Sequence, residues 1–181
     1  MTKEFLIKSD EEMQELGYKL GMVAFPNMLI TLEGDLGAGK TTMTKGIGRA
    51  LGVTKIINSP TFTIMKIYEG RLTLYHMDVY RIDNNSGDDY LTEYMESGGV
   101  CVIEWANNIS DLISDDHLEI NITIDDDFNR VVKIEAKSDI YQKCIEGLTL
   151  WRHYWLTHRQ LSYLLVFMMK KRKKDYSINK W

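Results

Sequence analysis

The sequence predicts an α/β fold, a three-layer sandwich built around a mixed β-sheet. A strand-like run at residues 28–32 leads through a glycine-rich loop into a helix-like segment at residues 41–51. Residues 100–103 are all apolar, which is typical of a strand buried on both faces of a sheet. Two predicted hairpins add antiparallel strands, so we expect parallel and antiparallel pairs in one sheet.

The first helix is predicted from its start and its spacing. Ser9 is a capping residue, and three acidic residues follow it, where the helix dipole favours negative charge. Apolar residues then recur at helical spacing until Pro26, at Met13, Leu16, Leu20 and Val23. We therefore expect a helix between Ser9 and Pro26.

Both hairpins are predicted from strand-like segments joined by short turns. Residues 61–68 and 72–80 are separated by three residues that include a glycine, the length of a hairpin loop. Residues 117–125 and 130–136 alternate apolar and polar side chains on either side of an acidic turn. Residues 83–89 are polar and turn-rich, and predict a loop.

Composition bounds the class of protein. The chain has 181 residues, of which 44% are hydrophobic and 27% charged, as in a globular protein with one domain. Cys101 and Cys144 have no paired spacing, which argues against a disulfide scaffold and against a zinc site. The first residues lack the basic start and apolar run of a secretory signal, so we expect a cytoplasmic protein.

Charge separates the end of the chain from the rest. Residues 148–181 contain eight Lys or Arg and one acid, a formal charge of +7. Because the whole chain has a net charge of −4, residues 1–147 carry −11. We predict a nucleotide-binding domain at residues 1–147 and an atypical basic and aromatic extension at 148–181. Its apolar run, residues 161–169, is shorter than the roughly 20 residues of a membrane span. The extension is either an amphipathic segment for RNA or an anionic membrane surface, or sequence read past a lost stop codon or out of frame.

The glycine-rich loop carries the clearest chemical signal. Gly34-Asp35-Leu36-Gly37-Ala38-Gly39-Lys40-Thr41 fits the phosphate-loop pattern, between a predicted strand and a predicted helix. Glycines let backbone N–H groups surround a phosphate, and the following helix adds its positive end. Lys40 supplies a cation for the β- and γ-phosphates, and Thr41 a hydroxyl for Mg²⁺. The sequence therefore predicts a phosphate-loop NTPase that binds ATP or GTP with Mg²⁺.

Two carboxylates are candidates for Mg²⁺ binding and hydrolysis. Glu104 directly follows the buried run at residues 100–103, where an acid would face the phosphates. Asp78 lies within a predicted strand. The alternatives are that Glu104 is merely solvated and that Asp78 is a strand-edge acid paired with Arg81 or Lys66.

Three further features each have two interpretations. Ser59-Pro60-Thr61 is either a switch segment that responds to the γ-phosphate or a polar turn that enters a strand. His76 is a possible proton carrier, although a lone strand histidine is more often structural. Trp105 belongs either to the core or to a contact surface.

Four motifs in this order resemble the TsaE family, the bacterial ATPases needed to make threonylcarbamoyladenosine in tRNA. The resemblance covers residues 9–136 and is much more specific than the phosphate loop alone. The motifs are the phosphate loop continued to Thr42, Ser59-Pro60-Thr61-Phe62-Thr63, Tyr75-His76-Met77-Asp78-Val79-Tyr80-Arg81 and Ile103-Glu104-Trp105.

The resemblance implies a set of roles. The phosphate loop from Gly34 to Thr42 would bind ATP, Thr41 and Glu104 would coordinate Mg²⁺, and the catalytic residues would be Lys40, Asp78 and Glu104. The residues around Ser59 would form a switch-like region near the γ-phosphate. Family members dock on a complex of TsaB and TsaD, and their ATP cycle resets that complex, so tRNA is involved indirectly.

Two departures from the family pattern are visible. The segment after Arg81 matches only loosely the usual acidic pair and glycine before a short helix, so no function is assigned to it. Ala106 stands where proline is common after the Glu-Trp pair, and we expect this change to be mild.

Two other functions compete with this one. A small-molecule kinase of the phosphate-loop class would add an arginine-rich lid, but the arginines Arg71, Arg81 and Arg130 are scattered. A nucleotide-gated interaction module would hydrolyse ATP only incidentally. The guanine-reading Asn-Lys-x-Asp pattern is absent from the sequence, which agrees with ATP, and Arg130 and the region of Ser9 are candidates for contacts on the adenine side.

Overall fold

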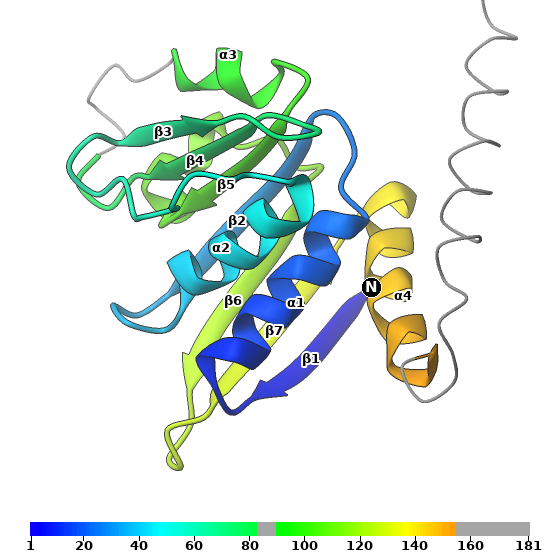
Figure 1. Cartoon of the computed structure of the whole chain (residues 1–181). Helices are drawn as coiled ribbons and strands as arrows, with labels where there is room; N and C mark the ends of the chain where they lie inside the picture. The colour runs from blue at the N-terminus through cyan, green and yellow to red at the C-terminus, as the bar shows by residue number, and fades with distance from the viewer. Residues whose placement is uncertain (83–89, 155–181) are drawn as a thin grey trace, which may run out of the picture. The chain divides into compact units, whose positions relative to one another are not determined.

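The computed structural model describes residues 1–82 and 90–154, and its elements are labelled in Figure 1. They are β1 (Thr2–Ile7), α1 (Asp10–Met22), β2 (Met28–Gly34), α2 (Lys40–Leu51), β3 (Met65–Tyr68), β4 (Leu74–Asp78), α3 (Leu91–Met95), β5 (Val100–Glu104), the 3-10 helix η1 (Ala106–Leu112), β6 (Leu118–Ile124), β7 (Arg130–Ala136) and α4 (Asp139–Tyr154).

All seven of these strands form one sheet, in the order β1-β7-β6-β2-β5-β4-β3. The four neighbours β6, β2, β5 and β4 run parallel to one another. The outer pairs β1–β7, β6–β7 and β3–β4 are antiparallel. The predicted α/β fold with a mixed sheet is therefore confirmed.

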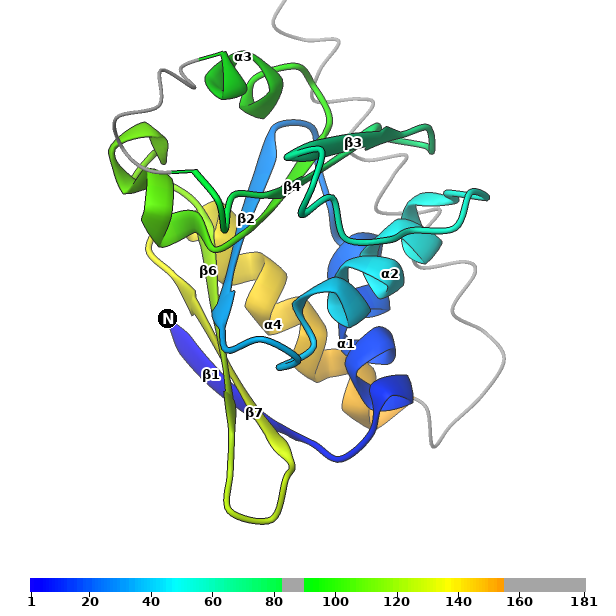
Figure 2. The same cartoon turned by 90° about the vertical axis from the view of Figure 1, so that its left-hand side faces the viewer.

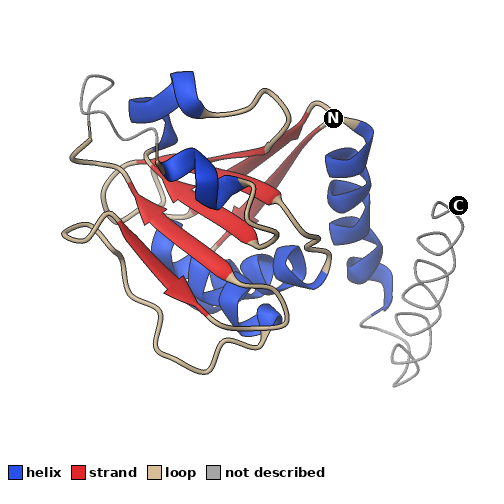
Figure 3. Ribbon diagram, turned by 90° about the horizontal axis from the view of Figure 1, so that it is seen from above, coloured by secondary structure: helices blue, strands red, loops and turns tan. Residues whose placement is uncertain are grey.

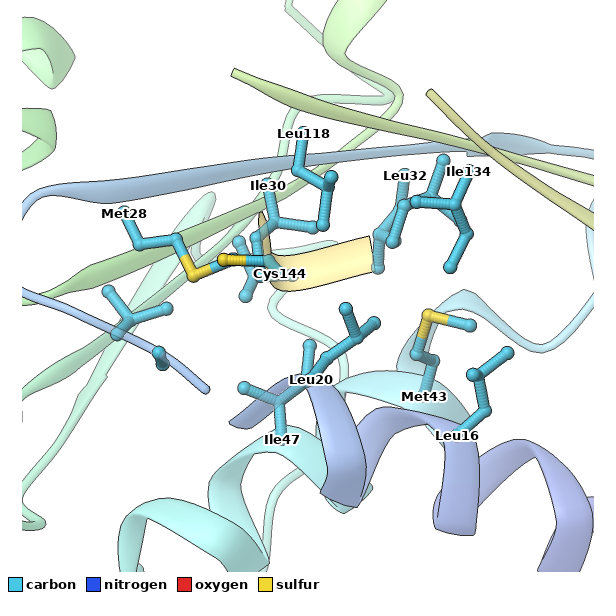
Figure 4. Close-up of a cluster of buried hydrophobic side chains, with 14 of the residues drawn as sticks. Leu16, Leu20, Met28, Ile30, Leu32, Met43, Ile47, Leu118, Ile134 and Cys144 are labelled. Carbon is cyan, nitrogen blue, oxygen red and sulfur yellow. The ribbon is translucent and has the colours of Figure 1, made fainter. Parts of the chain in front are cut away.

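Helices cover both faces of the sheet, as the predicted three layers require (Figures 2 and 3). Helices α1, α2 and α4 share one core cluster with the strands, and α3 and η1 share a second cluster. Side chains along β2 alternate between the two, since Ile30 belongs to the first cluster and Leu29 to the second. Figure 4 shows Ile30 and Leu32 of β2 facing Leu20 of α1 and Ile47 of α2.

Local signals place the first helix correctly. The Ser9 hydroxyl accepts a hydrogen bond from the backbone N–H of Glu12 at 3.2 Å, which is the N-cap that the sequence predicts. The helix ends at Met22, ahead of Pro26. The strand predicted at residues 28–32 continues to Gly34, because β6 pairs with β2 as far as that residue.

Other boundaries differ from the sequence predictions. The strand predicted at residues 61–68 begins only at Met65, so the prediction of a strand is wrong for residues 61–64. Residues 61–64 form turns instead, in which the Thr63 N–H donates to Pro60 O and Ile64 has a φ of 62°. The strand predicted at 72–80 is shorter, at Leu74–Asp78. Strand β1 has no counterpart among the predictions, because its pairing partner β7 is distant in the sequence.

The basic extension is described only in part. The chain divides into two compact units, Met1–Leu148 and Thr149–Trp181. The predicted boundary after residue 147 stays a prediction, and the loop at 83–89 and the basic run lie outside the described residues. In the parts of the chain that are described, no helix is long and apolar enough to cross a membrane.

Candidate functional site

The candidate site lies at the carboxyl ends of three neighbouring parallel strands, β2, β5 and β4. Open α/β sheets bind ligands at this edge. Leu32 of β2 is in register with Glu104 of β5, and Glu104 is in register with Asp78 of β4. Because the phosphate loop directly follows β2, the loop and both predicted carboxylates meet at this edge.

The phosphate loop has the backbone that its glycines permit. Gly34, Gly37 and Gly39 have φ values of 142°, 80° and 111°. A Cβ on Gly34 would clash with the Ile122 carbonyl oxygen on β6, so close packing requires glycine there. At Gly37 nothing lies within 4 Å of the Cβ position, and the positive φ alone calls for glycine.

The end of the loop presents the start of α2. Gly39 is the N-cap, and no side chain caps the helix. The first N–H groups of a helix have no partner within it and carry partial positive charge, which suits an anion. Of the other predicted loop residues, Ala38 is buried, Thr42 is half-buried, and Asp35 and Leu36 are exposed.

Lys40 folds back over the loop. Its Nζ donates hydrogen bonds to the carbonyl oxygens of Gly34, at 2.5 Å, and Asp35, at 3.0 Å. The same Nζ lies 3.8 Å from the centre of the Trp105 ring. Burial lowers the pKa of the Lys40 ammonium, while the negative charge of Glu104 acts in the opposite direction. The structure thus holds the ammonium at the loop that the sequence assigns to phosphate.

Glu104 is buried and connects to the start of α2. It is 3% exposed, and its Oε1 accepts a hydrogen bond from the Thr41 hydroxyl at 2.8 Å. The same Oε1 lies 2.7 Å from Nε2 of His76. The structure therefore brings together the two residues predicted to bind Mg²⁺, and the alternative of a merely solvated Glu104 is wrong.

Asp78 binds the segment that carries the second motif. Its Oδ2 accepts hydrogen bonds from the hydroxyls of Ser59, at 2.7 Å, and Thr61, at 2.5 Å. Its Oδ1 accepts the backbone N–H of Tyr80 at 3.2 Å. Pairing with Lys66 or Arg81, the alternative left open above, is not found. Lys66 Nζ donates to the Ser59 carbonyl, and the Arg81 guanidinium lies over the ring of Phe62.

Trp105 belongs to the site and not to the core alone. Its backbone is left-handed, with a φ of 65°, an uncommon conformation for a bulky residue. One face of the indole carries Lys40, and the Tyr80 ring lies 5.0 Å away, centre to centre. The strained backbone places the ring beside the phosphate loop directly after Glu104.

The residues at this edge fit a nucleoside triphosphate with Mg²⁺. The loop offers backbone N–H groups, a helix start and an ammonium for phosphate oxygens, while Thr41 and Glu104 are the oxygen ligands that Mg²⁺ prefers. In the described part of the chain, no group of three or more His, Cys, Asp or Glu could hold a metal ion alone. Mg²⁺ in nucleotide sites needs only one or two carboxylates, because phosphates and water complete its shell.

Of the three scattered arginines, Arg81 lies near this edge, over the Phe62 ring, and no contact of Arg71 or Arg130 with the edge is found in the described residues. Arg71 donates to the carbonyl oxygens of Gly21 and Ala24, where it binds the end of α1. Arg130 lies 3.9 Å from Asp10, close to the predicted region of Ser9. Arg71 is thus bound by another part of the fold, and the adenine-side contact of Arg130 and the region of Ser9 stays a prediction.

His76 is a site residue that the sequence alone does not assign to the site. The sequence leaves it as structural or as a proton carrier, yet it contacts the predicted Mg²⁺ ligand Glu104. A usable signal is the spacing, because His76 and Asp78 are two residues apart on a strand and so share a face. Linking His76 to Glu104 requires the pairing of β4 with β5, which the sequence does not state.

Comparisons with known proteins agree with this geometry. The family model described as "Threonylcarbamoyl adenosine biosynthesis protein TsaE" matches residues 7–132. The tRNA threonylcarbamoyladenosine biosynthesis protein TsaE of Bacillus subtilis (strain 168) is 45% identical over 140 residues, 77% of this chain and 89% of that protein. The protein of the same name from Treponema pallidum (strain Nichols) is 36% identical over 131 residues, 70% of this chain and 96% of that protein. A crystal structure of YdiB from Bacillus subtilis is similar with a TM-score of 0.74 at 39% identity, and covers 84% of this chain and 96% of that one.

Proposed function

Because the chain belongs to the TsaE family of threonylcarbamoyladenosine biosynthesis proteins, we propose that it is a Mg²⁺-dependent ATPase that acts on a complex of TsaB- and TsaD-type proteins. One observation carries the proposal of ATP hydrolysis. The hydroxyl of Thr41, at the start of α2, donates a hydrogen bond to Glu104 at the end of β5. Asp78, at the end of β4, is in register with Glu104. A phosphate loop that only binds nucleotide with Mg²⁺ needs one carboxylate for the metal, so the second buried carboxylate, Asp78, favours hydrolysis.

The residues divide the work of phosphoryl transfer to water. Lys40 and the N–H groups of the loop bind the β- and γ-phosphates and stabilise the negative charge that shifts between them. Thr41 and Glu104 hold Mg²⁺, which when bound neutralises charge on the phosphate oxygens. Asp78 orients the attacking water. Its Oδ2 accepts both hydroxyls, whereas its Oδ1 accepts only one backbone N–H and can accept a further hydrogen bond from the water.

Exposed apolar side chains around the site support a partner protein. Leu36 of the phosphate loop is 91% exposed, Phe62 next to Thr61 is 84% exposed, and Tyr80 beside Trp105 is 57% exposed. Exposed apolar side chains gathered on one surface mark interaction sites, and these three residues come from segments that contribute to the proposed site. TsaB- and TsaD-type proteins are the partners that the family role suggests, so the partner complex would sense the nucleotide state at this rim.

ATP hydrolysis by the purified full chain tests the proposal. We expect release of ADP and phosphate that requires Mg²⁺ and is lost in Glu104→Gln and in Asp78→Asn. Glu119→Gln is the matched control, because Glu119 lies on β6 at the register position of Thr31, away from the carboxyl ends. Transfer of the phosphate to a small molecule, or unchanged turnover in both site variants, would contradict it.

A further inference from the structure

His76 stands out among the buried side chains of the described residues. It is 0% exposed, its Nε2 lies 2.7 Å from Glu104 Oε1, and its Nδ1 is buried without a hydrogen-bond partner in the described part of the chain. Buried polar atoms are nearly always paired, so an unpaired one calls for an explanation. The roles assigned above to the phosphate loop, Glu104 and Asp78 leave His76 without one.

Strand geometry places His76 against Glu104 and not against Asp78. His76 of β4 is in register with Val102 of β5, two residues before Glu104, so His76 and Glu104 are diagonal neighbours on one face of the sheet. That face is otherwise apolar here, since Leu74 and Val102 belong to the core cluster under α1 and α2. An apolar side chain at position 76 would therefore suit the packing.

The contact has one direction when Glu104 holds a metal. A carboxylate that binds a metal can only accept hydrogen bonds, so His76 then donates from Nε2. Nδ1 has no partner among the described residues, whichever hydrogens the ring carries. Within the described residues, the buried ring thus has a single hydrogen bond, and that bond is made to Glu104.

Two donors converge on the same carboxylate oxygen. The Thr41 hydroxyl and His76 Nε2 both reach Oε1 of Glu104, at 2.8 and 2.7 Å. The other oxygen of Glu104, Oε2, has no hydrogen bond to the described residues. It is also not among the fully buried unpaired atoms of these residues, so it is not completely covered. Two hydrogen bonds on Oε1 fix the carboxylate plane and leave Oε2 for a ligand.

We propose that His76 is a positioning residue that orients the Glu104 carboxylate for Mg²⁺ beside Thr41, an inference that rests on the proposed function. The hydrogen bond from the ring limits rotation of the carboxylate, so less order has to be gained when the metal binds. Groups that hold a metal ligand through hydrogen bonds commonly change metal affinity about 10- to 100-fold when they are removed.

A Mg²⁺ titration of nucleotide binding by the full chain tests this role without relying on catalysis. The probe is a fluorescent ATP analogue, measured first with EDTA and then at increasing Mg²⁺. His76→Leu and His76→Ala remove the donor, while His76→Gln keeps an amide N–H that can reach Oε1. Met77→Leu is the matched control, because Met77 is equally buried but faces the opposite core cluster. Circular dichroism checks that each variant is folded.

The expected result is that folded His76→Leu or His76→Ala binds the analogue like wild type in EDTA but needs about 10 times more Mg²⁺ for half-saturation. His76→Gln is expected to recover most of that loss, and Met77→Leu to match wild type. An unchanged Mg²⁺ requirement without the donor, or a Gln variant no better than Leu, overturns the proposal for His76 alone. A wild-type chain whose nucleotide binding ignores Mg²⁺ overturns the proposed function as well.

Discussion

Asp78 and Glu104 stand side by side in register at the ends of β4 and β5, yet their carboxylates bind different parts of the molecule. Asp78 accepts hydroxyls from Ser59 and Thr61, whereas Glu104 accepts the hydroxyl of Thr41 at the start of α2. One carboxylate is thus joined to the segment after α2 and the other to the phosphate loop. Substitutions of Asp78 and of Glu104 should therefore have different effects on ATP hydrolysis and on the Mg²⁺ requirement.

The first prediction concerns Glu104. Glu104→Gln keeps the size of the side chain but removes the charge that holds Mg²⁺, so we expect kcat to fall about 100-fold or more. Nucleotide affinity in EDTA should change little, because the loop and Lys40 remain. Steady-state hydrolysis and a binding titration measure both, with Glu119→Gln as the control. Equal turnover in wild type and Glu104→Gln would contradict the assignment.

The second prediction separates Asp78 from Glu104. Asp78→Asn should lower kcat about 100-fold while KM for ATP and the Mg²⁺ requirement stay close to wild type, because Asp78 acts on water and not on the metal. Ser59→Ala and Thr61→Val leave the carboxylate in place and should have smaller effects. A large rise in the Mg²⁺ requirement of Asp78→Asn would instead make Asp78 a metal ligand.

Local sequence is enough for the parts of the site that depend on neighbouring residues. The loop from Gly34 to Thr41 lies between β2 and α2 as its pattern demands, and Glu104 ends β5 as an acid after a buried strand should. The pattern could not place Thr61 outside a strand, because its hydroxyl is bound by Asp78, 17 residues away. The contact of His76 with Glu104 depends on strand pairing in the same way.

A third prediction concerns the thiols. Burial raises the pKa of the Cys101 thiol far above its usual range, so the folded chain exposes no thiolate there at pH 8. In Cys144→Ala, the remaining thiol should react with an aromatic disulfide reagent only after unfolding. Because only the unfolded chain can then ionise Cys101, the free energy of unfolding should fall as pH rises above about 8.5. Rapid labelling of the folded protein would contradict this.

The fourth prediction concerns the basic extension. Leu148 is buried in the core cluster under α1 and α2, so a chain that ends at Gly147 loses a core side chain and should be less stable by about 2 kcal/mol or more. A chain that ends at Tyr154 keeps Leu148 and should bind ATP like the full chain. Thermal unfolding and a nucleotide titration measure the two effects. If the chain ending at Tyr154 is folded but loses ATP affinity, the extension is part of the nucleotide site.

The fifth prediction tests the exposed rim. Phe62→Ser removes an apolar side chain that is 84% exposed, has the Arg81 guanidinium over its ring, and is not one of the proposed Mg²⁺ ligands. Hydrolysis by the isolated chain should stay the same, while any change in rate caused by TsaB- and TsaD-type proteins should be reduced. Ile67→Ser, at an exposed position on β3, serves as the control for loss of apolar surface. An unchanged partner effect in Phe62→Ser would place the docking surface elsewhere.

In the proposed function, ATP hydrolysis by this chain sustains tRNA modification by the partner complex. The most direct measurement is the number of threonylcarbamoyladenosine products formed per TsaB–TsaD complex, with wild type, Glu104→Gln or Asp78→Asn added. We expect repeated turnover only with wild type, and about one product per complex with either variant or with no added chain. Equal multiple turnover with the hydrolysis-deficient variants would contradict the proposed function.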